Sequence, residues 1–245
     1  RPTSRTIIRI AHSLPWARGP LVRACFVIMH HGHARAGVLN TVSNAPHIYK
    51  SPKNARTVAW GPVLTATLQW VFPVKKGFEA RAVFSATSML FHLCIIVTPI
   101  FLGAHILLWE RGLGISWPAL GNLAADYLTL LAILTGVALL AQRVGARASR
   151  AISRPQDYFL PLLIIVPFVT GYLGMHPHLN PFGYNGTMFV HVMSANLIFL
   201  LMPFTKMSHV ALFPGTQLIS EMGWHLKPGA GEQVAIALGK ESDPL

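Results

Sequence analysis

Charged residues are scarce in this sequence. Only 11% of the 245 residues are Asp, Glu, Lys or Arg, whereas soluble domains carry about 25%. The 8 acidic residues are too few to solvate a soluble protein of this length, and 52% of the residues are hydrophobic. A mean hydropathy of +0.47 agrees with that shortage. The composition therefore indicates a membrane protein and argues against a soluble globular domain.

Cysteine is scarce as well, and this limits the kinds of metal site. Cys25 and Cys94 are the two cysteines of the chain. They are too few and too far apart in the sequence for an iron–sulfur cluster or a structural zinc site. Cys94 lies inside an apolar run, where a small buried thiol is the simplest interpretation.

Four apolar stretches approach or reach the length of about 20 residues that a transmembrane helix needs. The stretches are residues 83–109, 119–142, 158–175 and 187–205, the last of which we expect to continue to about residue 213. The first three stretches together hold a single charged residue, Asp126. The predicted fold is an all-α membrane protein, a bundle of about four transmembrane helices with a basic cytoplasmic N-terminal segment.

Positive charge is distributed unevenly along the chain, and this predicts its orientation. More than half of the 20 Lys and Arg residues lie in residues 1–82, and the loop between the second and third stretches holds four more. The other two loops hold only Arg111. Because cytoplasmic loops are rich in Lys and Arg, we expect the N-terminal segment, the basic loop and the C-terminus to be cytoplasmic. The four basic residues of that loop are Arg143, Arg147, Arg150 and Arg154.

The same pattern predicts three segments. Residues 1–82 form a basic cytoplasmic or interfacial segment, whose apolar bursts are too short to span and are expected to be interfacial pieces. Residues 83–214 form the transmembrane bundle, and residues 215–245 form a cytoplasmic tail. We therefore interpret the net charge of +12 as an orientation signal. The expected partner is membrane lipid, and we expect no nucleic-acid partner.

Four of the 12 histidines lie within the predicted spans. His92 and His105 are on the first span and His191 and His209 are on the fourth, whereas the second and third have none. An ionisable residue inside a bilayer is costly and by default marks a functional site. His191 and His209 are 18 residues apart, which is five turns and about 27 Å of a straight helix. They should share a face and lie near opposite membrane surfaces.

Depth then predicts which histidines meet. The first and fourth spans run antiparallel, so His105 pairs with His191 near the outer surface and His92 pairs with His209 near the inner one. Neutral imidazole is a good axial ligand for iron, and two such pairs at two depths predict two stacked haems b. His92 and His105 are 13 residues apart, about 140° around a straight helix. Pro99 between them can kink or rewind that helix.

Several motifs resemble those of the respiratory nitrate reductase gamma subunit-like family of di-haem cytochromes b. That family includes the membrane subunits of heterodisulfide-reductase-like and sulfate-reducer electron-transfer complexes. The resemblance covers about residues 86–214. The motifs are Leu90-Phe91-His92, Thr170-Gly171 before an outer loop, the spacing of His191 and His209, and the ending Pro203-Phe204-Thr205-Lys206-Met207-Ser208-His209.

This resemblance implies that the four helix histidines ligate two haems b. It also implies that the protein is the membrane subunit of a quinone/quinol oxidoreductase in a bacterial inner membrane. Such a subunit passes electrons between menaquinone or ubiquinone and a peripheral iron–sulfur or cytochrome subunit. Family members usually have five helices, and no clear equivalent of the first occurs here. The first-pair spacing is also longer than in nitrate reductase itself, which favours a relative without a nitrate-specific role.

Two further residues are candidates for the same chemistry. Asp126, in the outer half of the second span, could accept a proton from a quinone, or it could pair with a backbone group or a polar neighbour. Lys206 lies one turn from His209 and could meet a haem propionate, although snorkelling to the inner interface also explains it. His30, His31 and His33 are a weak metal signal, and a solvated basic segment explains them more simply.

Three other functions use the same features. A hydrogenase- or formate-dehydrogenase-type cytochrome b usually spreads its haem histidines over more helices than two. A transporter or proton channel with a histidine relay should show internal repeats or matched broken helices, and we find no such symmetry in the sequence. A membrane anchor without a cofactor would only dock a soluble enzyme.

Overall fold

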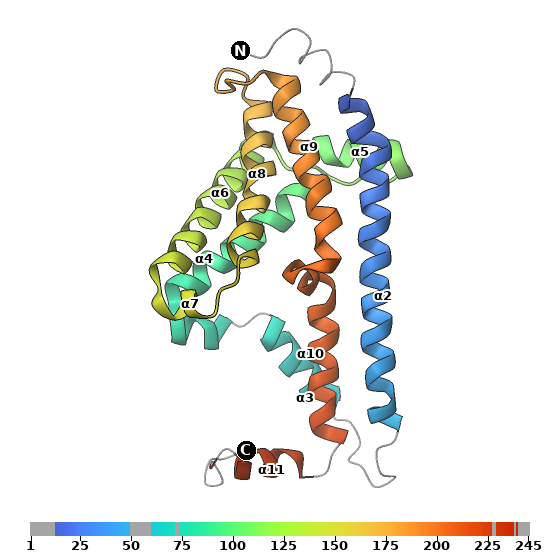
Figure 1. Ribbon diagram of the computed structural model, residues 1–245, viewed down its shortest axis with the longest axis vertical. Coiled ribbons are helices and arrows are strands. Elements are labelled where there is room, and N and C mark those ends of the chain that lie inside the picture. Colours follow the sequence, from blue (N-terminus) through green and yellow to red (C-terminus); the bar gives the residue numbers. More distant parts are fainter. Residues whose placement is uncertain (1–12, 50–59, 72–73, 227–228, 238, 240–245) are drawn as a thin grey trace. The chain divides into compact units, whose positions relative to one another are not determined.

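The chain is α-helical because a helix satisfies its own backbone hydrogen bonds, which an apolar segment in a bilayer requires. The computed structural model describes residues 13–49, 60–71, 74–226, 229–237 and 239. Over these residues the protein is all-α, without a strand (Figure 1). This confirms the predicted fold class.

Four helices in the described part of the chain are long and apolar enough to cross a membrane, as predicted. The first span is Arg81–Phe101, in helix α4 (Val74–Phe101). The second is α6 (Asn122–Gly145) and the third is α8 (Gln156–Met175). The fourth, Tyr184–Phe204, consists of α9 (Tyr184–Leu201) and the 3-10 turn η2 (Met202–Phe204). The protein is therefore a multi-pass membrane protein.

The chain divides into two compact units, which cut across the three segments expected from charge. The first unit comprises Arg1–Ile28 and Lys76–Leu201, and the second comprises Met29–Lys75 and Met202–Leu245. The first unit therefore contains nearly all of the four spans.

Helices α6, α8 and α9 of the first unit pack in that order, with α8 in the middle (Figure 1). Cys94 of α4, Ala132 of α6 and Phe168 of α8 form a buried cluster, and Cys94 is fully buried as its position in an apolar run predicted. A Cβ atom on Gly136 would lie 2.9 Å from Ile165 Cδ1 and 2.9 Å from Phe91 Cε2. Small residues thus let three membrane helices approach closely.

Large apolar side chains cover the outside of this unit. Leu134 of α6 is 67% exposed, Leu162 of α8 is 56% exposed and Val190 of α9 is 47% exposed. Such exposure would be costly in water, but lipid tails are themselves apolar. These faces are therefore the surfaces that contact lipid.

The first span ends earlier than predicted. We expected one helix over residues 83–109, but α4 stops at Phe101 and Leu102 is extended, with φ −72° and ψ 125°. A separate helix, α5 (Gly103–Leu113), follows and ends at Gly114 in the left-handed conformation. Pro99 lacks an amide hydrogen and weakens the last turns of α4. His92 and His105 therefore lie on different helices, a correction to the sequence prediction.

The fourth stretch is also interrupted. We expected a continuous helix to about residue 213, but α9 gives way to η2 and then to the 3-10 turn η3 (Lys206–Ser208). Pro203 cannot donate a backbone hydrogen bond, and Thr205 starts the next turn by accepting from the Met207 amide. His209 begins α10 (His209–Leu226). The count of five turns between His191 and His209 is therefore wrong.

The N-terminal basic segment contains a long helix where short interfacial pieces were expected. After the π-helical turn η1 (Ala17–Leu21), helix α2 covers Val22–Tyr49, 28 residues. The expectation rested on the length of apolar runs, whereas a helix tolerates polar residues between them. In the first unit, the Phe26 ring of α2 packs edge-on against Phe199 at 6.0 Å and Trp109 at 5.6 Å.

The second unit contains the continuation of α2, from Met29 onward. Helix α3 (Trp60–Val71) packs against α10. A Cβ atom on Gly32 of α2 would lie 2.6 Å from Pro203 Cβ, so glycine permits a close approach to η2. Two short helices complete the described chain, namely α11 (Ala230–Ala237) in this unit and α7 (Arg147–Ala151) between α6 and α8 in the first.

Candidate functional site

The four histidines that the sequence placed within spans lie on four different helices, and only His92 and His191 lie within the spans of the structure. His92 is on α4, His105 on α5, His191 on α9, and His209 is the first residue of α10. His92, His105 and His191 belong to the first unit, whereas His209 belongs to the second. The predicted pairing of His92 with His209 therefore stays a prediction.

His105 and His191 lie close together in the first unit. The centroids of their rings are 6.1 Å apart, and the ring planes are inclined by 31°. Stacked rings lie closer, as Tyr172 and His176 show with centroids 4.1 Å apart. An N–H···N hydrogen bond between two imidazoles would put their centroids about 5 Å apart. The His105 and His191 rings are therefore neighbours that are separated by more than a stacked pair or a directly hydrogen-bonded pair.

The break at Leu102 brings His105 to this position. Three carbonyl groups at the end of α4 lose their helical partners there, and each gains another. His105 Nδ1 bonds the Pro99 oxygen at 2.9 Å. Trp117 Nε1 donates to the Ile100 oxygen at 3.0 Å, and the Leu120 amide donates to the Phe101 oxygen at 2.9 Å. The helix end is thus satisfied, and one of its caps fixes the His105 ring.

His191 is fixed by the neighbouring helix α8. Its Nδ1 atom lies 2.9 Å from the Pro167 carbonyl oxygen and 3.3 Å from Thr170 Oγ1. A Cβ atom on Gly171 would lie 3.2 Å from His191 Cε1 and 3.4 Å from Nδ1, tighter than most real contacts. The Thr170-Gly171 element noted in the sequence therefore supplies a polar contact and the space for this ring.

These contacts determine where the imidazole protons lie. A carbonyl oxygen can only accept, so Nδ1 of His105 and Nδ1 of His191 each carry a hydrogen. In a neutral imidazole the lone pair then lies on Nε2. Within the described residues, neither Nε2 makes a hydrogen bond. Ligating histidines usually donate their second nitrogen to a carbonyl or carboxylate in this way.

A positive charge lies near the pair. The Arg18 guanidinium on η1 interacts electrostatically with His191. Its neighbour Ala17 is fully buried against Val192 of α9, and its carbonyl accepts a hydrogen bond of 3.2 Å from Asn196 Nδ2. Arg18 was not singled out from the sequence, because its apolar neighbours gave no sign that η1 packs on α9.

The other two histidines and Lys206 are exposed. His92 Nδ1 bonds the Ser88 carbonyl at 2.7 Å, and His209 Nδ1 bonds the Lys206 carbonyl at 2.6 Å. His33 makes the same local bond to a carbonyl four residues earlier. A bond from Nδ1 to a carbonyl oxygen about one turn earlier is therefore common to these three histidines. The bond of His105 instead crosses a helix break, and that of His191 joins two helices.

Asp126 has a specific partner. Its Oδ2 atom lies 3.4 Å from His176 Nε2, and the His176 Nδ1 atom bonds the Tyr172 carbonyl at 2.9 Å. The Tyr172 ring stacks on the His176 ring, and His178 lies edge-on to it at 5.8 Å. His176 was not singled out from the sequence as a partner of Asp126. Asp126 lies in the first turns of α6 and His176 directly follows α8, and the antiparallel order expected of successive spans is the signal that could have joined them.

Comparisons with known proteins give one significant similarity. No family model and no solved structure matches this chain. The chain is 30% identical over 176 residues to a protein of Nitratidesulfovibrio vulgaris (strain Hildenborough) whose name is given simply as "Protein". The matched region covers 71% of this chain and 73% of that relative. The chain belongs to the same protein family as this Nitratidesulfovibrio vulgaris protein.

Proposed function

We propose that the protein is a membrane cytochrome b subunit of a respiratory electron-transfer complex. It carries electrons between a quinone pool and a peripheral iron–sulfur or cytochrome partner through two bis-histidine haems b. This proposal extends the resemblance to the nitrate reductase gamma subunit-like family. One observation supports it above all others, the geometry of His105 and His191.

The separation of these two rings fits a metal ion between them. Imidazole nitrogen binds a transition metal at about 2.0–2.1 Å, and each ring centre lies about 1 Å further out, so two trans rings have centroids about 6 Å apart. The observed value is 6.1 Å. Both rings carry their hydrogen on Nδ1 and present Nε2, the state that an axial haem ligand requires.

The remaining residues have assigned places in this proposal. His105 and His191 hold the outer haem, and Arg18 offers a cation to a propionate group. From their spacing in the sequence, His92 and His209 would hold the inner haem, with Lys206 as its propionate partner. The bound haems supply one-electron chemistry, whereas the protein supplies ligands, orientation and a medium of low dielectric.

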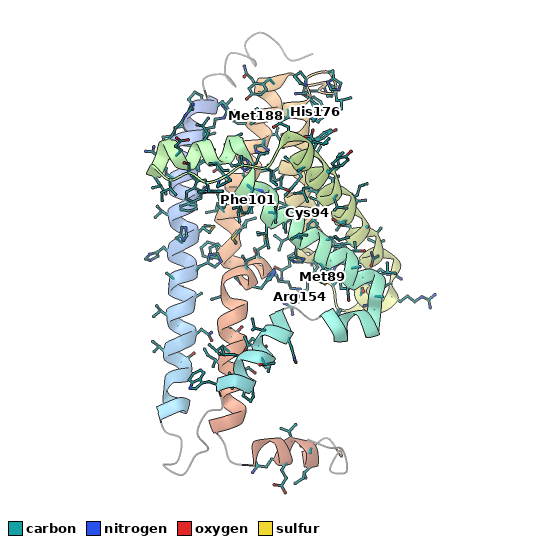
Figure 2. All side chains as sticks on the ribbon, turned by 180° about the vertical axis from the view of Figure 1, so that it is seen from behind. Met89, Cys94, Phe101, Arg154, His176 and Met188 are labelled. Atoms are coloured by element: carbon teal, nitrogen blue, oxygen red, sulfur yellow. The ribbon has the colours of Figure 1, made fainter. Side chains whose placement is uncertain are left out.

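The ends of the first unit fit the proposed orientation. His176 and Met188 lie at one end of the bundle, and Met89 and Arg154 lie toward the other (Figure 2). Arg143 and Arg154 flank the loop that joins α6 and α8. Because basic loops stay in the cytoplasm, we assign the His176 end, and with it the His105–His191 pair, to the outside of a bacterial inner membrane.

Haem content tests this function directly. The full chain is purified from bacterial membranes in mild detergent, and a pyridine haemochrome spectrum gives the haem b per chain. We expect two haems for the natural sequence and one for His191→Ala or His105→Ala, because loss of an axial ligand releases only the haem it holds. His178→Ala, a histidine in the outer loop, is the matched control and should keep two.

Each result decides between the candidate functions. A natural chain that binds no haem would overturn the proposal and leave two hypotheses, a transporter or proton channel and a membrane anchor. Two haems retained in both single variants would show that this pair does not hold one.

A further inference from the structure

A cluster of titratable side chains lies at the outer end of the first unit. It joins Asp126 of α6 to Tyr172 of α8 and to His176, the residue that follows that helix. The Asp126 side chain is 37% exposed and that of His176 is 21% exposed, and His178 beside them is exposed. The cluster thus lies between the membrane bundle and the outer solution.

The contacts of His176 fix how many protons the cluster holds. Its Nδ1 faces the Tyr172 carbonyl, which can only accept, so this nitrogen carries a hydrogen. Its Nε2 faces Asp126 Oδ2 at 3.4 Å. Two lone pairs would repel at this contact, so one proton must lie between them, on the imidazole or on the carboxyl group. The pair stores one proton when neutral and carries a charge of −1 without it.

The position of the pair relates it to the His105–His191 site. Gly171 contacts the His191 ring, and His176 lies five residues further along the chain at the end of the same helix. With a rise of 1.5 Å per residue, this separation is about 7.5 Å along the axis. The pair therefore lies beside the site on its outer side.

We propose that Asp126 and His176 together accept a proton from a quinol that is oxidised beside the outer haem, and release it to the outside. This inference rests on the proposed function and adds the acceptor to it. The sequence offered Asp126 alone. The structure adds His176 as the group that holds the proton, with Asp126 as its charged partner.

The reaction balances as follows. Oxidation of a quinol to a quinone breaks two O–H bonds and releases two electrons and two protons. The two haems of the proposed function would accept the electrons, one each. One proton goes to the anionic Asp126–His176 pair, which becomes neutral, and the other goes to water. The pair returns to its anionic form when its proton leaves to the exposed side.

Stability alone does not explain the pair well. An ion pair exposed to this extent contributes about 0–1 kcal/mol, so its removal should leave the fold intact. The function of the pair can therefore be tested by substitutions that keep shape and remove titration, Asp126→Asn and His176→Gln. Asp157→Asn is the matched control, because Asp157 lies at the start of α8, at the opposite end from His176, and bonds the Arg154 amide.

The test follows haem reduction in the purified full chain. Menadiol is the quinol probe, and dithionite, which needs no proton acceptor on the protein, is the reference reductant. Rates are measured by absorbance between about pH 5.5 and 8.5, the range in which a histidine changes charge. Haem content is measured on the same samples by the pyridine haemochrome method.

We expect menadiol to reduce Asp126→Asn and His176→Gln about 10²-fold or more slowly than the natural chain, the usual size of a lost general base. Both variants should lose any pH dependence that the pair gives to the rate of the natural chain. Asp126→Glu should recover much of the rate. Dithionite rates and haem content should not change in any variant.

Three results would overturn the inference. Menadiol rates and pH profiles that match the natural chain would show that the pair is not the acceptor. An equal fall in the dithionite rate, or a loss of haem, would show a structural role. A natural chain with two haems that menadiol cannot reduce would also exclude the inference. If the natural chain binds no haem at all, the proposed function itself fails, which the haem measurement distinguishes.

Discussion

Gly171→Ala is the most direct test of how α8 positions His191. The added Cβ atom would lie 3.2 Å from His191 Cε1 and 3.4 Å from Nδ1, so the ring must move by a few tenths of an ångström. The hydrogen bonds to Pro167 and Thr170 oppose this movement, and ligation of the proposed haem would oppose it further. Overpacking of this kind costs about 1–3 kcal/mol, which corresponds to a roughly 5- to 150-fold weaker affinity for the outer haem.

The assay for this variant is haem retention during dilution in detergent, together with the electron paramagnetic resonance spectrum of the low-spin haems. One haem should be lost faster or show shifted g-values, and the other should not change. Gly186→Ala on α9 is the control, because its Cβ atom would meet nothing within 4 Å. Two haems retained with natural spectra in Gly171→Ala would refute the placement of this ring against α8.

Two further substitutions test other contacts of the first unit. The Thr170 hydroxyl donates to the Val166 oxygen at 2.7 Å, so it can only accept from His191 Nδ1. Thr170→Val should therefore make His191 a weaker base and raise the midpoint potential of the outer haem by up to about 60 mV in a redox titration; an unchanged potential would contradict this. Gly136→Ala places a Cβ atom 2.9 Å from Ile165 and Phe91 and should lower the free energy of unfolding by about 1–3 kcal/mol. Thermal unfolding in detergent measures this change, and Gly145→Ala, which meets nothing within 4 Å, should have no effect.

The membrane architecture could be predicted from the sequence because a bilayer imposes a simple rule. A charge-free run of about 20 apolar residues has few alternatives to a spanning helix. Asp126, the one charge within the first three predicted stretches, is compatible with this rule, because it lies near the N-terminus of α6 and pairs with His176. The spans that the structure describes match the predicted ones to within a few residues at most ends.

The helix interruptions could not be predicted, because hydropathy does not report backbone geometry. Residues around Leu102 and Pro203 are as apolar as their neighbours, yet the helix ends at both places. A proline inside an apolar run can kink a helix or end it. The outcome depends on distant caps such as Trp117. Tertiary contacts of this kind are absent from a single sequence.

The candidate site was predictable in part. Matching depths predicted that His105 and His191 would meet, and the structure places their rings 6.1 Å apart, although by a broken helix and not a straight one. The role of both as haem ligands stays a prediction. Arg18 was missed because it is remote in sequence and acts through the packing of η1 on α9.

The early end of α4 has an electrostatic consequence. The peptide dipoles of a helix add up to about half a negative charge at its C-terminus, and α4 ends at Phe101, where the Pro99 carbonyl bonds the His105 ring. Any cation held between His105 and His191 therefore lies near the negative pole of a long helix. If that cation is the iron of the proposed outer haem, this field would favour its ferric form, and the break that displaces His105 would make that haem harder to reduce.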